Sequence, residues 1–448
     1  MAKKLFGTDG VRGVANQYPM TAEFALKLAM ACGQKVCQRQ RRVAIGRDTR
    51  ISGPMLESAL AAGFMAAGVE VMRLGVLPTP AVTSIVADLP VDMAVMITAS
   101  HNPYHDNGIK LIAANGDKFA DEVTAELEAM IAEDNFALDT DRIGTVKDNA
   151  EAVVMYLQKA KGFITEPQPL KCLRVVLDCA NGVFAEIMPQ VFKDLGAGVI
   201  AIGNAPDGLN INRDCGSQHP QKMFETVRES HAQLGVAVDG DGDRIIVCNE
   251  KGEKVASEQL IAFLAKFLRA EGKYNGNAVV STVLSNTALE RYVRKELGMD
   301  YYSTKVGERP VVAKMKETGC SVGGEESGHV VVLNYGKSGD GLIVALLLSI
   351  GLLKSGKKMS EIFPLFTPDP FVFESLRVAD REVVKTAVAD EKLLSVVEKA
   401  RQEMGNEGRV VLHPSGTEPL IRVWVGGKNA DLVAKVSADI INEVKRFQ

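Results

Sequence analysis

The same strand pattern occurs three times along this chain of 448 residues. Each copy begins with a β-rich run that ends in a polar loop, at residues 41–50, 173–182 and 277–286. A helix-length segment then leads to a second strand, a third strand that ends in polar residues, and a fourth that we expect to pair with the third as a hairpin. Such spacing is typical of βαβ crossovers and a largely parallel sheet. The repeat is too long for a solenoid, so it predicts three related domains.

The fold class that this repeat predicts is α/β. Mostly parallel sheets need helices on both faces, so each copy should form an α/β/α domain with a mixed, largely parallel sheet. The end of the chain lacks the pattern and is typical of a smaller α+β domain. We expect the four domains to surround a central cleft, with boundaries at residues 1–152, 153–252, 253–366 and 367–448.

Charge and apolar patterning exclude several classes of partner. A net charge of −4 favours neither nucleic acid nor an anionic membrane. The longest apolar run, residues 341–353, is shorter than the about 20 residues that span a bilayer, so we expect a buried helix there. The first residues lack the apolar core of a signal peptide, and the seven cysteines show no CxxC spacing. These features predict a reduced, cytoplasmic protein.

Ser100 stands in the string TASHNP, directly after the apolar run of residues 94–97. A hydroxyl at the end of a buried strand is placed where α/β proteins carry reacting groups. His101, Asn102 and Lys110 offer donors that could hold a phosphate on it, and a phosphoserine could pass that phosphate to a sugar hydroxyl. The alternative is a serine that only closes a turn. A hydrolase dyad with His101 is disfavoured, because neighbouring side chains on an extended segment diverge and no GxSxG motif is present.

The string DGDGDR places Asp239, Asp241 and Asp243 at alternate positions. Oxygen ligands at this density favour Mg²⁺ or Ca²⁺ over zinc. An EF-hand loop is the alternative, but such a loop needs glycine where this chain has Arg244, and the flanking segments are typical of strands. We therefore expect a catalytic Mg²⁺ site, with a metal-free acidic turn as the remaining possibility.

A third polar loop, GGEESGH, follows the third strand of the last repeat. Glu325, Ser327 and His329 alternate there and could face one side, where they would suit vicinal hydroxyls. A plain βα loop is the alternative.

The fourth polar loop is HPSGTEPLIR, near the C-terminus. The backbone N–H groups of Ser415, Gly416 and Thr417 could form an anion nest, and Arg422 could add a bidentate fork to a phosphate. A surface turn is the alternative. The loops GTDGVRG and GRDTRISG also carry arginines, among them Arg50, and spacing alone does not separate anion contacts from ordinary salt bridges.

These four loops, in this order, resemble those of the α-D-phosphohexomutase superfamily over essentially the whole chain. The opening FGTDGVRG, the extended TASHNPYHDNGIK and the loop GEESGH resemble its bacterial branch that acts on glucosamine phosphates. Mannose and glucose mutases usually carry methionine where this chain has Glu326. One departure is His413, where relatives often have arginine, and it leaves the charge at that edge of the phosphate site in doubt.

The resemblance implies an isomerase that interconverts glucosamine 6-phosphate and glucosamine 1-phosphate, on the route to UDP-N-acetylglucosamine and peptidoglycan. Ser100 would carry the phosphoryl group, a glucosamine 1,6-bisphosphate would be the intermediate, and the chain would form a homodimer. Mg²⁺ would be bound by the Ser100 phosphate with Asp239, Asp241 and Asp243. The other implied roles are sugar recognition by Glu325, Ser327 and His329, phosphate binding by Ser415, Gly416, Thr417 and Arg422, and assistance at the phosphoserine by Arg12, His101 and Lys110.

Three other functions stay open at this point. A phosphomannomutase/phosphoglucomutase would differ only in substrate, and Glu326 is a candidate acceptor for the 2-amino group that separates the two. A Mg²⁺-dependent phosphatase would release free phosphate through Ser100. A non-catalytic phosphosugar-binding protein on the same fold would leave Ser100 unmodified.

Overall fold

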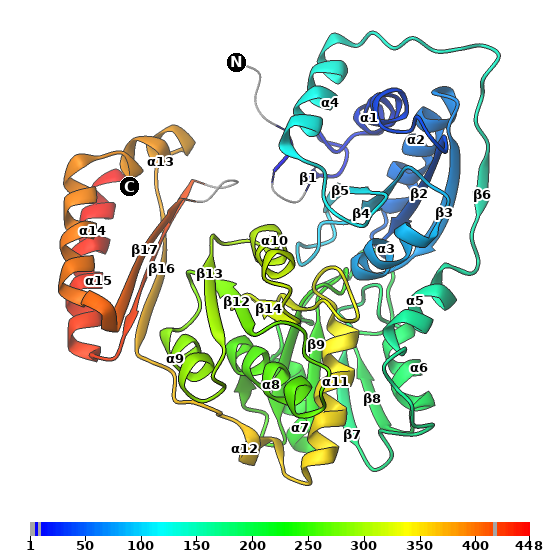
Figure 1. Cartoon of the computed structure of the whole chain (residues 1–448). Coiled ribbons are helices and arrows are strands. Elements are labelled where there is room, and N and C mark those ends of the chain that lie inside the picture. Colours follow the sequence, from blue (N-terminus) through cyan, green and yellow to red (C-terminus); the bar gives the residue numbers. More distant parts are fainter. Residues whose placement is uncertain (1–4, 8–9, 415–418) are drawn as a thin grey trace.

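A computed structural model describes residues 5–7, 10–414 and 419–448, and it shows three α/β/α domains followed by a smaller α+β domain (Figure 1). Domain I contains a six-stranded sheet with the order β1-β5-β4-β2-β3-β6. Its elements are β1 (Val11–Val14), α1 (Ala22–Lys35), β2 (Arg42–Arg47), α2 (Gly53–Ala66), β3 (Glu70–Val76), α3 (Thr79–Ile85), β4 (Met93–Ile97), β5 (Asp106–Ala113), α4 (Asp121–Glu133) and β6 (Val146–Asp148).

Domains II and III repeat this arrangement with smaller sheets. Domain II has α5 (Ala152–Ala160), β7 (Arg174–Asp178), α6 (Ile187–Asp194), β8 (Gly198–Ile202), α7 (Gln221–Ser230), β9 (Leu234–Val238), β10 (Ile245–Asn249) and β11 (Lys254–Val255). Domain III has α8 (Ser257–Ala270), β12 (Ala278–Thr282), α9 (Thr287–Lys295), β13 (Asp300–Thr304), α10 (Glu308–Thr318), β14 (Val322–Gly324), β15 (Val330–Val332), α11 (Gly341–Ser355) and α12 (Met359–Ile362).

The predicted threefold repeat is confirmed at the level of sheet order. The three sheets share the sequences β3-β2-β4-β5, β8-β7-β9-β10 and β13-β12-β14-β15. In each, the first three strands are parallel, and the last is an antiparallel hairpin partner of the third. The third strand therefore ends at the same sheet edge in all three domains, and this is where the polar loops begin. The edge strands β1, β6 and β11 were not expected, because such short segments carry no clear periodicity.

The core joins domains I to III into one body. A single apolar cluster runs from Ala44 in domain I to Phe363 at the end of domain III, and a second cluster lines the opposite face of the domain I sheet. Strands β4 and β9 are buried along their whole length, which explains why they read as continuous apolar runs rather than alternating ones. The expected buried helix is α11, whose first turn is capped by the Asp340 carboxylate.

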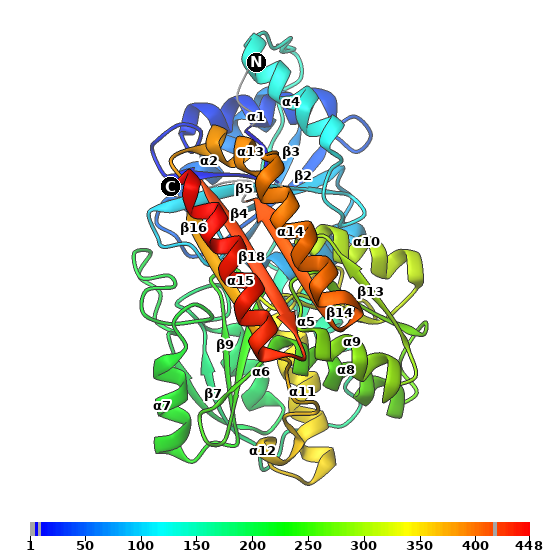
Figure 2. The same ribbon diagram turned by 90° about the vertical axis from the view of Figure 1, so that its left-hand side faces the viewer.

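Domain IV has an apolar core of its own. It consists of β16 (Phe371–Arg377), α13 (Arg381–Val388), α14 (Glu391–Met404), β17 (Gly408–Pro414), β18 (Leu420–Gly427) and α15 (Ala430–Val444). Helices α14 and α15 cover the face of its antiparallel sheet that is turned away from the other domains (Figures 1 and 2). Trp424 is buried, as its alternating surroundings predicted.

Among the described residues, no helix is both long and apolar enough to cross a membrane. All seven cysteines are unpaired.

The shared core predicts the effect of a cavity in α11. Leu346 is fully buried, so Leu346→Ala should lower the free energy of unfolding by about 2–5 kcal/mol, through lost burial and an unfilled cavity. Urea unfolding followed by circular dichroism measures this loss. The matched change Leu138→Ala, at a leucine that is 47% exposed in the same body, should stay within about 0.5 kcal/mol of the unmodified chain. Equal losses in the two variants would contradict the assigned core.

Candidate active site

Ser100 lies in the loop after β4, with its backbone in the left-handed region at a φ of 53°. Its hydroxyl donates a hydrogen bond to Oδ2 of Asp239 at 2.7 Å and lies 3.3 Å from Nδ1 of His101. The expectation that the Ser100 and His101 side chains diverge was wrong, because it assumed an extended segment. The left-handed turn brings the two side chains together and aims the hydroxyl across the domain boundary.

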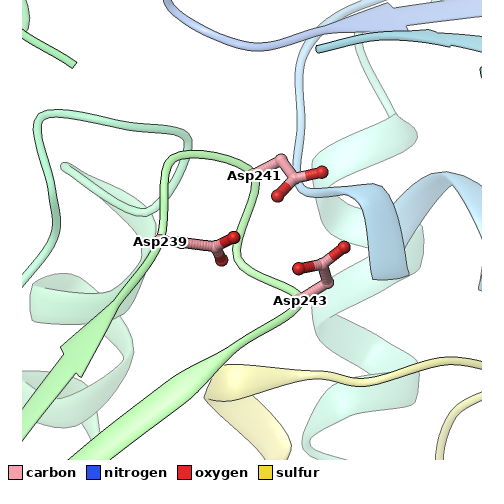
Figure 3. A group of neighbouring side chains, drawn as sticks. All are labelled: Asp239, Asp241 and Asp243. Atoms are coloured by element: carbon pink, nitrogen blue, oxygen red, sulfur yellow. The ribbon is translucent and has the colours of Figure 1, made fainter. Parts of the chain in front are cut away.

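The three aspartates lie in the tight loop between β9 and β10, where their carboxylates point toward one another (Figure 3). One oxygen from each lies within 4.8 Å of the others, and all three residues are buried. Burial raises the pKa of Asp239, and the neighbouring charges of Asp243 and Asp241 raise it further. The strands on either side exclude an EF-hand, whose loop joins two helices.

Lys110 supplies positive charge to this cluster from domain I. It lies on β5, which pairs with β4, and its ammonium group lies 2.8 Å from Oδ2 of Asp241 and 3.3 Å from Oδ2 of Asp243. One lysine cannot balance three carboxylates, so the cluster favours a further cation. Within the described residues, Oδ1 of Asp241 is buried and accepts no hydrogen bond. An all-oxygen donor set with such an open position fits a hard divalent cation.

Thr79 is a site residue that the sequence analysis missed. It lies at the start of α3, and its hydroxyl donates to Oδ2 of Asp241 at 2.6 Å while its N–H donates to the Asp241 carbonyl at 2.9 Å. Domain I thus holds Asp241 of domain II through both its side chain and its backbone. The only available signal was a hydroxyl residue directly after the predicted strand that became β3.

His101 is a neutral imidazole at physiological pH. Burial lowers its pKa to about 3, and the positive charges of Arg244 and Arg12 act in the same direction. Arg12 lies on β1, opposite Gly108 of the same strand that carries Lys110. The structure therefore gathers Arg12, His101 and Lys110 around Ser100, as the resemblance implied.

The GGEESGH loop is a hairpin turn between β14 and β15, closed by a hydrogen bond from the Glu325 N–H to the His329 carbonyl at 2.8 Å. Its side chains do not alternate as on a strand. His329 is buried with Nε2 3.7 Å from Oδ1 of Asp243, which places this loop beside the aspartate cluster. The Glu325 carboxylate accepts the Gly307 N–H at 2.8 Å, and Ser327 is half-buried.

Glu326 points its carboxylate to the Thr282 hydroxyl, which donates to it at 2.9 Å. Burial raises the pKa of Glu326 to about 7, and the nearby charge of Glu325 adds to this effect. A carboxylate so poised has a strong preference for a cationic partner.

The fourth loop is only partly described. Ser415, Gly416 and Thr417 lie outside the described residues. Arg422 lies on β18 directly opposite His413 of β17. Burial lowers the pKa of His413, and the charge of Arg422 lowers it further, so Arg422 is the cation of this pair at neutral pH.

Comparison with known proteins identifies the family. Models of the phosphoglucomutase/phosphomannomutase alpha/beta/alpha domains I, II and III match residues 3–138, 154–252 and 256–368, and the C-terminal domain of the same family matches residues 375–443. A phosphoglucosamine mutase from Chelativorans sp. (strain BNC1) is 42% identical over 453 residues, covering 99% of this chain and 98% of the relative. The phosphoglucosamine mutase of Rhodospirillum rubrum is 44% identical over 448 residues, with 98% of each chain covered.

Two solved structures share the whole architecture. A phosphoglucomutase/phosphomannomutase family protein from Burkholderia thailandensis matches with a TM-score of 0.81 at 26% identity, covering 99% of this chain and 97% of that one. The N-acetylphosphoglucosamine mutase of Aspergillus fumigatus, in complex with GlcNAc-6P and magnesium, matches with a TM-score of 0.65 at 16% identity, covering 99% and 95%. At that identity the second match shows the fold alone.

The chain therefore belongs to the phosphoglucomutase/phosphomannomutase family of phosphohexomutases. Within this family it groups with the phosphoglucosamine mutases, which are isomerases of amino-sugar metabolism, and this confirms the branch that the sequence loops predicted.

The aspartate cluster predicts a specific response to metal. Mg²⁺ should raise the thermal unfolding midpoint of the unmodified chain, because binding to the folded state stabilises it. Asp243→Asn should lose this rise. In EDTA, however, Asp243→Asn should unfold at least as high as the unmodified chain, because one of three mutually repelling buried carboxylates is then neutral. Scanning fluorimetry with and without Mg²⁺ measures both effects.

The matched control is Asp134→Asn. Asp134 is a half-exposed carboxylate that pairs with Lys27 away from the cluster. Its variant should keep the full Mg²⁺-dependent rise. An undiminished rise in Asp243→Asn would show that the cation binds elsewhere.

Proposed function

We propose that the chain interconverts glucosamine 6-phosphate and glucosamine 1-phosphate through a phosphorylated Ser100 and a glucosamine 1,6-bisphosphate intermediate. The observation that carries this proposal is the contact between the Ser100 hydroxyl and Asp239 at 2.7 Å, inside a buried cluster that also holds Lys110. A hydroxyl that only closed a turn would have no reason to lie among three carboxylates.

In this proposal, the phosphoryl group on Ser100 passes to the free hydroxyl of the sugar phosphate, and the other phosphate of the bisphosphate then returns to Ser100. Such in-line transfers gain mainly from positioning and charge stabilisation. Lys110 and Arg12 supply positive charge, and neutral His101 lies 3.3 Å from the Ser100 hydroxyl as a hydrogen-bonding partner for the reacting oxygen.

Mg²⁺ is the proposed cation, held by Asp239, Asp241, Asp243 and an oxygen of the Ser100 phosphate. When bound, it would stabilise negative charge on the transferring phosphoryl group. The donor set supports this choice, and so does the magnesium present in the A. fumigatus enzyme. That same enzyme has been crystallised with glucose 1,6-bisphosphate, which supports a hexose bisphosphate as intermediate.

The remaining committed roles follow the same proposal. Glu325, Ser327 and His329 would contact sugar hydroxyls, and His329 reaches the site from domain III beside Asp243. Arg422, with Ser415, Gly416 and Thr417, would hold the phosphate that does not react. We also propose a homodimer, a cytoplasmic location, service to UDP-N-acetylglucosamine and peptidoglycan synthesis, and the domain boundaries given above.

Loss of the carrier hydroxyl provides the first test. Ser100→Ala should remove mutase turnover while the unfolding midpoint changes little, because only one buried oxygen is lost. Ser84→Ala is the control, since the Ser84 hydroxyl is also buried but donates only to the Ala81 carbonyl. Turnover of glucosamine 6-phosphate with glucose 1,6-bisphosphate and Mg²⁺ is measured alongside the intact mass of the chain.

The same assay separates the other functions. A mutase gives glucosamine 1-phosphate, a phosphate on Ser100 and no net inorganic phosphate. Stoichiometric release of inorganic phosphate would establish a phosphatase instead. Binding without turnover or modification would establish a phosphosugar-binding protein.

Glu326 provides a test of sugar selectivity. If its carboxylate faces the cationic 2-amino group, Glu326→Gln should lower kcat/KM for glucosamine 6-phosphate by about tenfold, the value of one charge-assisted hydrogen bond. The kcat/KM for glucose 6-phosphate should not fall. Parallel assays with glucosamine, glucose and mannose 6-phosphates measure this ratio, and equal losses on all three sugars would remove Glu326 from the recognition of the amino group.

A further inference from the structure

Arg50 is a fully buried arginine directly behind the Ser100 loop, and every guanidinium N–H is used there. Its Nε donates to Oδ2 of Asp48 at 2.9 Å, and both side chains are inaccessible to solvent. One terminal nitrogen donates to the carbonyls of Pro103 and Asp106, and the other donates to those of Ser100 and Asn102 at 3.0 and 2.8 Å. A planar fork of five donors matches such a set of acceptors, whereas an ammonium group does not.

Asp48 fixes this arginine and connects it to the other side of Ser100. Its carboxylate accepts the Arg50 backbone N–H at 3.0 Å and the Thr98 hydroxyl at 2.7 Å. The Thr98 hydroxyl in turn accepts the Ser100 N–H at 2.9 Å. Ser100 is therefore held at both its N–H and its carbonyl by one buried ion pair, which accounts for a left-handed backbone that a serine rarely adopts.

Asn212 extends this network across the domain boundary. Its side-chain amide, buried in domain II, donates to the carbonyls of Ser100 and Asn102 at 2.9 and 3.0 Å. These are the same two carbonyls that one Arg50 nitrogen contacts from domain I. The orientation of the Ser100 loop thus depends on groups from both domains, and so does its alignment with Asp239 of domain II.

We propose that Arg50 is a positioning residue for phosphoryl transfer, which with Asp48 and Asn212 holds Ser100 in the left-handed geometry that aligns its oxygen with the aspartate cluster. This inference rests on the proposed role of Ser100 as carrier. Arg50 does not contact the substrate in this proposal, because its guanidinium is fully occupied by Asp48 and backbone carbonyls.

The test compares Arg50→Lys with Asn212→Gly. Lysine keeps the charge beside Asp48 but cannot reach four carbonyls at once. Glycine tolerates the positive φ of Asn212 and removes only the amide. Each variant is incubated with glucose 1,6-bisphosphate and Mg²⁺, the phosphorylated fraction is read from the intact mass, and kcat and KM for glucosamine 6-phosphate are divided between binding and chemistry.

If the network positions the carrier, kcat per phosphorylated enzyme falls by about 100-fold in Arg50→Lys and about tenfold in Asn212→Gly, as expected for a reacting atom displaced by a fraction of an ångström to an ångström. KM should stay within about threefold of the unmodified value, since substrate contacts are untouched.

Arg41→Lys is the matched control. Arg41 also has a positive φ and also donates to two backbone carbonyls, those of Ala67 and Gly68, but it lies at the other end of β2. Its variant should keep the unmodified kcat.

An unchanged kcat per phosphorylated enzyme in both Arg50→Lys and Asn212→Gly would overturn the inference and leave the network a purely structural one. If Arg50→Lys does not fold, Asn212→Gly decides by the same criterion. Turnover of the unmodified chain without phosphate on Ser100 would refute the proposed function itself, and the inference would fall with it.

Discussion

Mutual repulsion among three buried carboxylates is the constraint on which this structure depends. Asp239, Asp241 and Asp243 lie in one short loop, and burial in a poorly polarisable interior makes their charges costly. Domain II alone offers little to offset this cost. Lys110 and the Thr79 hydroxyl come from domain I, so the active site and the interface between the two domains are the same set of contacts. The continuous apolar core beneath them keeps that interface closed.

The repeated topology explains how separate loops meet. In each α/β/α domain, the third strand of the repeat ends at the sheet edge where chemistry is placed, and its hairpin partner returns from there. The three copies have taken different tasks at this one position: Ser100 in domain I, the aspartates in domain II, and the loop with His329 in domain III. One fold unit therefore supplies a reacting group, a charged cluster and a recognition loop without any change of architecture.

The sequence was informative wherever a signal is local. Continuous apolar runs predicted the buried strands, and the polar strings after them predicted Ser100, the aspartates and His329. It was uninformative about contacts between distant segments: Thr79 and Asp241 are 162 positions apart, and Asn212 meets Ser100 across 112. Backbone handedness was also hidden, since nothing in TASHNP shows that Ser100 adopts a positive φ. For this reason the contact with His101 was misjudged, and Arg50 could not be separated from an anion contact.

The hydrogen bond from Ser100 to Asp239 has a consequence for the proposed cycle. Phosphorylation replaces the donated proton with a group of about −2 charge, beside carboxylates that already repel one another. Thermodynamic linkage then requires that a bound cation and the phosphoryl group each strengthen the retention of the other. The chain can keep its phosphate between turnovers only while it keeps its cation, so metal supply sets the lifetime of the charged enzyme as well as the speed of each transfer.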